Sequence, residues 1–94
     1  PLLVVVLNNQ ALGAGYHKMR AHNMAPALSV IRSPDLGAVA RAYGAKGRLA
    51  RTIDEVRTAV AEWTANPGPM ILDVRTMRDV PTLARRRIFY GRDE

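Results

Sequence analysis

The chain opens on an unbroken apolar run from Leu2 to Leu7, which stops at Asn8 and Asn9. A strand with one solvated face would alternate apolar and polar residues, and this run does not alternate. The run therefore predicts a strand of a parallel sheet that is buried on both faces. Because ligands bind outside the carboxyl ends of such strands, the candidate site lies at the two asparagines and the loop after them.

The segment after the asparagines is expected to be a loop followed by a short helix. Gly13 and Gly15 disfavour regular structure over residues 10–15. Helical spacing of larger side chains then predicts a helix over residues 16–23. Residues 24–33 are expected to be irregular, because Pro26 interrupts any helix there.

Two further helices are indicated by the residues at their ends. Ser33 is expected to cap the first, with Pro34 in its first turn, and Gly44 suits its end. Thr52 and Glu55 form a capping box at the start of the second helix. The Asn-Pro-Gly-Pro sequence after residue 65 ends that helix.

Two more strands are predicted, over residues 47–50 and 70–74. Asp73 interrupts the second apolar run, so this strand is expected either to lie towards a sheet edge or to direct its carboxylate at a partner. Strands that alternate with helices predict an α/β fold with a parallel sheet and right-handed crossovers. From Arg75 onward the chain is basic and lacks a clear period, which indicates a tail.

Four segments, taken in order, resemble one enzyme family. They are the strand ending in Leu-Asn-Asn with its glycine-containing loop, residues 34–47, the helix that opens at residues 52–55, and residues 68–74. In this order they resemble the C-terminal part of the thiamine-diphosphate-binding domain of acetolactate synthase-like and 2-oxo acid decarboxylase-like enzymes. The resemblance implies a partial parallel-sheet, Rossmann-like domain over residues 1–74, with a basic C-terminal tail over residues 75–94.

The resemblance also implies an activity. It points to part of a thiamine-diphosphate- and Mg²⁺-dependent lyase or transferase that decarboxylates a 2-oxo acid or joins it to an acceptor. The cofactor performs that chemistry, and the protein anchors and orients it. Some relatives also bind FAD, which nothing in this sequence indicates. The parent enzyme is expected to be a homo-oligomer that binds its cofactor between subunits.

The family pattern is incomplete in this chain. The Gly-Asp-Gly half of the cofactor motif lies upstream in the family, and the glutamate that activates the cofactor lies in another domain. We therefore expect the chain to be a piece of a larger enzyme, to need the upstream part as its partner, and to be inactive alone.

The resemblance assigns roles to the residues of the loop. Amide and carbonyl oxygens suit Mg²⁺. By position in the family, Asn9 supplies a side-chain ligand and Ala11 a backbone carbonyl, while the amides near Leu12 and Gly13 help to hold phosphate. Asn8 is expected to tie the strand to the loop. Without the resemblance, the asparagine pair would be interpreted as a simple strand terminator, because Asn is a common turn residue.

His17 is the candidate catalytic residue. It follows the cofactor loop, and an imidazole there is suited to donate a proton to a substrate. The alternative interpretation is a surface histidine without a catalytic role. No nucleophile–base–acid triad, P-loop or complete dinucleotide fingerprint can be assembled from the remaining residues.

Composition narrows the alternatives. A length of 94 residues allows one small domain, and the absence of cysteine excludes disulfides and cysteine-based zinc sites. No apolar run is long enough to span a bilayer, and a cytoplasmic location is expected. The net charge of +6 raises the question of nucleic acid, but the basic residues are dispersed except at Arg85-Arg86-Arg87, and aromatic residues are scarce.

Three function classes therefore remain. The first is the thiamine-diphosphate enzyme described above, which acts on a small 2-oxo acid. The second is a non-catalytic α/β interaction module or a remnant of such an enzyme domain. The third is a binder of anionic ligands or nucleic acid that uses the arginine tail, although a solvated tail is the simpler explanation of those arginines.

Overall fold

A computed structural model of the chain describes residues 1–80 and 82–91. The chain forms two compact units, each described here by itself: the first comprises Pro1–Asn8 and Ser33–Thr76, and the second comprises Asn9–Arg32 and Met77–Glu94. Positions 81 and 92–94 of the expected basic tail lie outside the described residues. Within the described ranges, every helix is too short or too polar to cross a bilayer.

The first unit is a small parallel sheet with two helices. Its elements are β1 (Leu3–Asn8), α2 (Leu36–Ala42), β2 (Lys46–Ala50), α3 (Ile53–Ala65) and β3 (Met70–Arg75). The strand order is β1-β3-β2, and both pairings are parallel. The predicted α/β class, with strands that alternate with helices, is confirmed.

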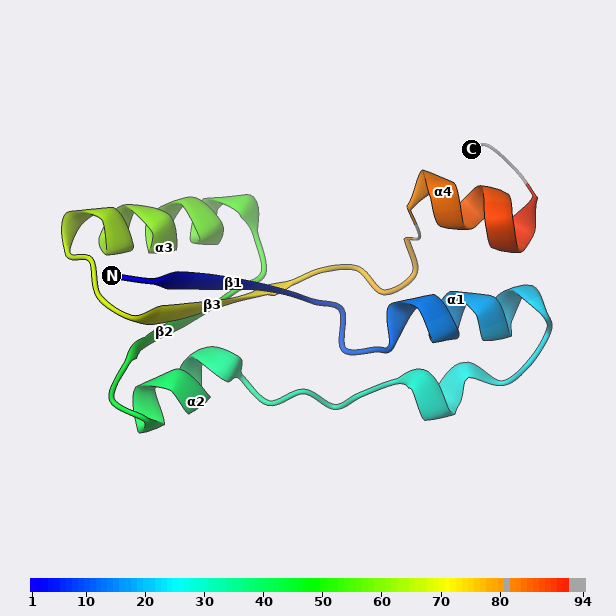
Figure 1. Cartoon of the computed structure of the whole chain (residues 1–94), viewed down its shortest axis with the longest axis horizontal. Helices are drawn as coiled ribbons and strands as arrows, with labels where there is room; N and C mark the ends of the chain where they lie inside the picture. Colours follow the sequence, from blue (N-terminus) through cyan, green and yellow to red (C-terminus); the bar gives the residue numbers. More distant parts are fainter. Residues whose placement is uncertain (81, 92–94) are drawn as a thin grey trace. The chain divides into compact units, whose positions relative to one another are not determined.

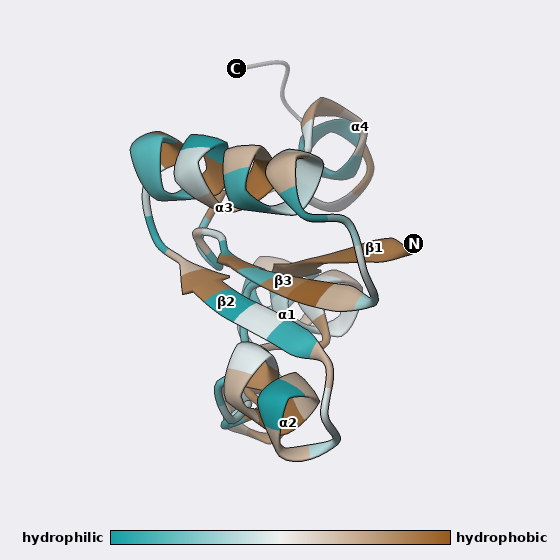
Figure 2. Cartoon of the chain, turned by 90° about the vertical axis from the view of Figure 1, so that its left-hand side faces the viewer, coloured by the Kyte–Doolittle hydropathy of each residue, from teal (hydrophilic) through white to brown (hydrophobic). Residues whose placement is uncertain are grey.

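The two helices of this unit cover opposite faces of the sheet, as Figures 1 and 2 show for α2 and α3. Side chains alternate between faces along a strand. Met70 and Leu72 of β3 pack with Ala50 and Ala59 in the core under α3. Asp73 therefore points to the other face, where α2 begins. Burial of these apolar side chains is the main force that holds the unit together.

One expectation about the sheet is wrong, and one pair of alternatives is decided. Within the described part of the chain, β1 pairs with β3 only and is not buried on both faces, since Val5 is 49% and Leu7 74% exposed. The reason is that α2 and α3 pack on β2 and β3 rather than on β1. Secondly, β3 is the central strand of the three, so Asp73 does not mark an edge. The alternative, a carboxylate directed at a partner, is confirmed.

The helix ends follow local chemistry, with two corrections. The side chain of Asp35, not that of Ser33, caps α2 by accepting a hydrogen bond from Ala38 N at 3.0 Å. Thr52 caps α3 as expected, accepting from Glu55 N at 3.1 Å. The second bond of the predicted capping box, from Thr52 N to the carboxylate of Glu55, is replaced. That carboxylate accepts instead from the N–H of Arg51, the residue before Thr52.

A close backbone contact joins α2 to β2. A Cβ atom built at Gly47 would overlap the carbonyl oxygen of Gly37, and a Cβ at Gly37 would lie 2.6 Å from Arg48 N. These two glycines therefore let the helix approach the strand more closely than any other residue type allows.

The second unit contains short helical segments: α1 (Gly13–Ala21), the 3₁₀ turn η1 (Pro26–Ser29), α4 (Leu83–Arg85) and the π-helical turn η2 (Arg86–Tyr90). α1 begins at Gly13, three residues earlier than expected, because Tyr16 N donates to Leu12 O at 2.8 Å and closes a first turn across both glycines. The aperiodic segment around the arginine triplet is also helical.

Candidate functional site

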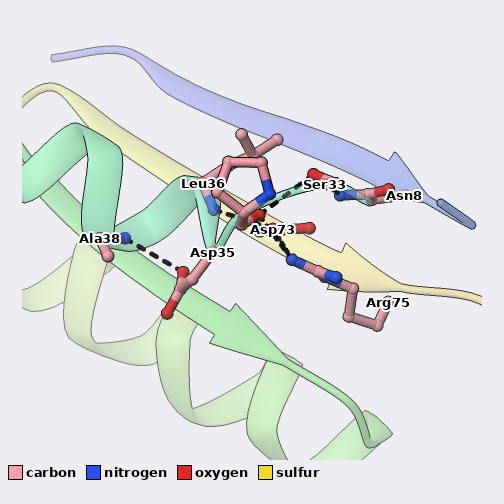
Figure 3. Close-up of polar contacts among 8 residues, drawn as sticks. Asn8, Ser33, Asp35, Leu36, Ala38, Asp73 and Arg75 are labelled. Atoms are coloured by element: carbon pink, nitrogen blue, oxygen red, sulfur yellow. Dashed lines mark hydrogen bonds and ion pairs between the residues drawn. The ribbon is translucent and has the colours of Figure 1, made fainter. Parts of the chain in front are cut away.

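The carboxyl end of β1 carries a polar cluster within the first unit (Figure 3). Asn8 Nδ2 donates to Ser33 Oγ at 2.9 Å, and Ser33 Oγ donates to Pro34 O at 3.1 Å. The backbone of Asn8 is also engaged, since its carbonyl accepts from Thr76 N at 3.0 Å. Asn8 thus joins the end of β1 to two other segments of the same unit.

The centre of this cluster is a buried ion pair. Asp73 is fully buried, and its Oδ2 accepts from Leu36 N at 3.0 Å and from Arg75 Nη2 at 2.9 Å. The Arg75 side chain is 9% exposed, and Nη2 also donates to Pro34 O at 2.7 Å. Residues two apart on a strand share a face, so β3 places both charges beside the start of α2.

The environment of Asp73 fixes its charge. Burial raises the pKa of this carboxyl group, but the Leu36 amide, the Arg75 guanidinium and the Asn8 side chain together outweigh burial. The pKa of Asp73 therefore lies below its ordinary value, and the group is a carboxylate at neutral pH. It serves as an acceptor for Arg75 and α2 rather than as a proton donor.

The predicted cofactor loop starts the second unit. Asn9 Oδ1 accepts from Ala11 N at 3.1 Å, and Gln10 between them has a left-handed backbone with φ of 57°. This is an Asx turn, in which the side chain of Asn replaces a backbone acceptor. A Cβ atom at Gly13 would lie 2.9 Å from Asn9 Nδ2. The Asn9 amide is therefore held between the Ala11 N–H and the bare Cα of Gly13.

Ala11 forms an isolated antiparallel bridge with Val30. Two hydrogen bonds of 2.7 Å flank the bridge, from Leu12 N to Ser29 O and from Ile31 N to Gln10 O. Neither bond uses the peptide groups of Ala11, as expected for a non-hydrogen-bonded pair. In extended backbone the N–H and C=O of one residue point to the same side, so the Ala11 carbonyl lies on the side of the Asn9 amide.

The two loop amides expected to hold phosphate differ in their availability. The N–H of Leu12 donates to Ser29 O, so in this structure it closes the loop instead of pointing at a ligand. Gly13 is the first residue of α1, and the leading N–H groups of a helix have no acceptor within that helix. Ala14 and Gly15 also belong to α1 rather than to a loop.

His17 is buried, with 4% of its surface exposed, so the surface-histidine alternative is wrong. Its ring meets that of Tyr16 edge to face, with the centroids 5.2 Å apart. Burial lowers the pKa of His17; a backbone hydrogen bond with Arg78 and the charge of Asp79 oppose this only in part. The imidazole is therefore neutral at pH 7.

A cluster around Tyr16 was not expected from the sequence. Tyr16 Oη donates to Asp79 Oδ1 at 2.8 Å, and Arg20 Nη1 bonds the same oxygen at 3.1 Å. The guanidinium carbons of Arg20 and Arg78 lie 5.6 and 5.5 Å from the Tyr16 ring centroid. These contacts attach α1 to residues 78 and 79 inside the second unit. Their signal in sequence is weak, because the partners are about sixty positions apart.

Among the residues missed in the first unit, Arg75 had a clearer signal in the sequence. Arg75 was assigned to the tail, yet it is the last residue of β3. A charged residue in an apolar strand, followed two positions later by the opposite charge, indicates a pair on one face. Ser33 carried no such signal, because its partner Asn8 is distant in sequence.

One comparison with known proteins found a match. Searches of the curated proteins and of the solved structures found no match. The family model for the thiamine pyrophosphate enzyme, C-terminal TPP binding domain, matches residues 1–74. Thiamine pyrophosphate is the same compound as thiamine diphosphate. Since the match covers most of the chain, the chain belongs to the thiamine pyrophosphate enzyme family, as part of its C-terminal cofactor-binding domain.

Proposed function

We propose that this chain anchors the diphosphate of thiamine diphosphate, together with Mg²⁺, in an acetolactate synthase-like enzyme that decarboxylates or carboligates a 2-oxo acid. The observation that carries the proposal is the Asx turn: it places the Asn9 amide oxygen and the peptide groups of Ala11 on one side of the loop. The complete enzyme is proposed to be a cytoplasmic homo-oligomer, with the upstream half of the cofactor motif supplied outside this chain.

The donor set fits the metal. Mg²⁺ prefers hard oxygen ligands and usually retains phosphate oxygens among them. The side-chain oxygen of Asn9 and the backbone carbonyl of Ala11 are two neutral oxygens of this kind. They leave the remaining positions to phosphate oxygens, water and a carboxylate from the upstream part. Neutral ligands also leave the positive charge of the metal available to the diphosphate.

The start of α1 favours an anion in the same region of the second unit. α1 has nine residues and no acidic residue in its first turn. Its leading N–H groups, beginning with Gly13, carry a partial positive charge that stabilises phosphate. Leu12 supports this arrangement indirectly, because its bond to Ser29 holds the loop closed.

The division of labour in catalysis follows from these roles. When bound, thiamine diphosphate supplies the carbanion-stabilising chemistry of the reaction. Asn9, Ala11 and Gly13 bind and orient the diphosphate end. His17 is proposed to donate an N–H hydrogen bond towards the substrate, because its lowered pKa leaves the imidazole neutral and without a proton to transfer at pH 7.

Replacing Asn9 tests the metal ligand. In the intact cofactor-binding protein, Asn9→Ala is expected to weaken Mg²⁺-dependent thiamine diphosphate binding more than about 100-fold, because a ligand to the metal is lost. Asn8→Ala is expected to cost about tenfold, the lower end for a residue that only supports ligands. Calorimetric titration with the cofactor at fixed Mg²⁺ measures both. Equal and small losses would contradict the assignment.

Replacing Gly13 tests the position of the Asn9 side chain without removing it. The added Cβ of Gly13→Ala would push the Asn9 amide, which is a flexible group, so folding should be nearly unaffected. Cofactor affinity is expected to fall about tenfold. Gly15→Ala is the matched control, because a Cβ there meets nothing within 4 Å. The same affinity in both variants would count against the proposed role of the Asn9 amide.

A further inference from the structure

The chain passes between its two units at three points, and all three leave the first unit at one polar cluster. On the first-unit side the passages begin at Asn8, Ser33 and Thr76. Asn8 is hydrogen-bonded to both of the others: its Nδ2 donates to Ser33 Oγ at 2.9 Å, and its carbonyl accepts from Thr76 N at 3.0 Å. Asn8 is therefore bonded directly to both other residues at which the chain leaves the first unit.

The buried ion pair braces this junction. Arg75 is the register partner of Asn8 across the β1–β3 ladder. Its Nη2 reaches Pro34 O at 2.7 Å, the residue after Ser33, and Asp73 holds the same Nη2 at 2.9 Å (Figure 3). Charged hydrogen bonds of this length are among the stronger ones in proteins. The segment that carries Ser33 is thus fixed to the central strand of the sheet.

We propose that Ser33, Asp73 and Arg75 are positioning residues for the cofactor loop. They fix Asn8, and the peptide bond from Asn8 to Asn9 transmits that position to the start of the loop. None of the three is proposed to touch the cofactor. The inference rests on the proposed role of Asn9, and its physical basis is that small misplacements of binding groups have large effects in preorganised sites.

Ser33→Ala tests the proposal in the intact protein, because it removes one acceptor of the Asn8 side chain, together with the bond from the Ser33 hydroxyl to Pro34 O. Its dissociation constant for thiamine diphosphate at saturating Mg²⁺ is expected to rise about tenfold. Thr52→Ala is the matched control: it also removes one hydroxyl from the first unit, at the cap of α3, away from the residues at which the chain leaves that unit. Ser33→Thr retains the hydroxyl and should restore affinity. Equal affinities for Ser33→Ala and Thr52→Ala would overturn the proposal.

A second measurement does not depend on the cofactor. The Thr76 amide, which donates to Asn8 O, is expected to exchange hydrogen about fivefold faster in Ser33→Ala than in Thr52→Ala, the factor expected for the net loss of one hydrogen bond. If the wild-type protein bound no thiamine diphosphate, the proposed function would fail. The exchange rate of the Thr76 amide would still test whether Ser33 stabilises the hydrogen bonds of Asn8. Equal exchange of the Thr76 amide in the two variants would refute the junction itself.

Discussion

Gly47→Ala is expected to destabilise the first unit by about 3 kcal/mol, the upper range for overpacking a well-packed site. The reason is that the new Cβ would occupy the space of the Gly37 carbonyl oxygen. That oxygen belongs to backbone, so it cannot move aside as a flexible side chain would. α2 would have to withdraw from β2, and Asp73 would lose its contact with Leu36 N. Urea unfolding followed by circular dichroism measures the change.

Gly68→Ala is the matched control for this substitution. A Cβ at Gly68 would lie 3.9 Å from the nearest atom, Lys46 Cε, which is an ordinary van der Waals contact. We therefore expect a change of less than about 0.5 kcal/mol, as for most surface substitutions. Similar losses in the two variants would show that the close approach of α2 to β2 does not govern stability.

The parts of the fold that were predicted correctly depend on local signals. β1 and β3 were recognised by their apolar runs, and α3 by the hydroxyl of Thr52, because both signals are contained within a few neighbouring residues. The errors concern contacts between elements, which depend on residues distant in sequence. Burial of β1 on both faces depends on which helices cover it, and the order β1-β3-β2 brings together residues distant in sequence.

The start of α2 shows the same limit at smaller scale. Both Ser33 and Asp35 are suitable capping residues, and local propensity does not choose between them. Tertiary contacts decide: the hydroxyl of Ser33 is used by Asn8, while Asp35 is left to accept from Ala38 N. Because Ser33 has a long-range partner, its hydroxyl does not cap the helix as its residue type would suggest.

The candidate site was predicted in part for a related reason. Four segments in a fixed order along the chain resemble thiamine-diphosphate enzymes, and the match over residues 1–74 confirms a thiamine pyrophosphate-binding domain. The spacing of Asp73 and Arg75 indicates the ion pair itself, but Leu36 N and Pro34 O, which also bond the pair, are distant in sequence and reach β3 only through the fold. Arg75 in particular needed the end of β3 to be placed one residue further along.

Asp73→Ala is expected to cost about 3–5 kcal/mol of unfolding free energy, the usual result of removing one partner of a buried ion pair. Arg75 would then retain a buried charge without its carboxylate, and Leu36 N would lose its acceptor. Asp54→Ala is the control, because it breaks the exposed pair with Arg57 and should cost less than about 0.5 kcal/mol. Comparable losses from the two variants would contradict a structural role for the buried pair.

The lowered pKa of Asp73 adds a pH dependence with a definite sign. The group is charged in both the folded and the unfolded chain well above its ordinary value of 3.8, so its stabilising contribution is fully present there. As the pH falls below that value, the unfolded chain takes up the proton first, and the contribution disappears as the pH passes through the lower folded pKa. Asp73→Asn cannot titrate at this position, so the difference in unfolding free energy between wild type and Asp73→Asn should be constant above about pH 5 and shrink below about pH 4. Urea titrations of both proteins across this range provide the measurement, and a difference that stays constant into acid would mean that the carboxylate of Asp73 is not preferentially stabilised in the folded chain.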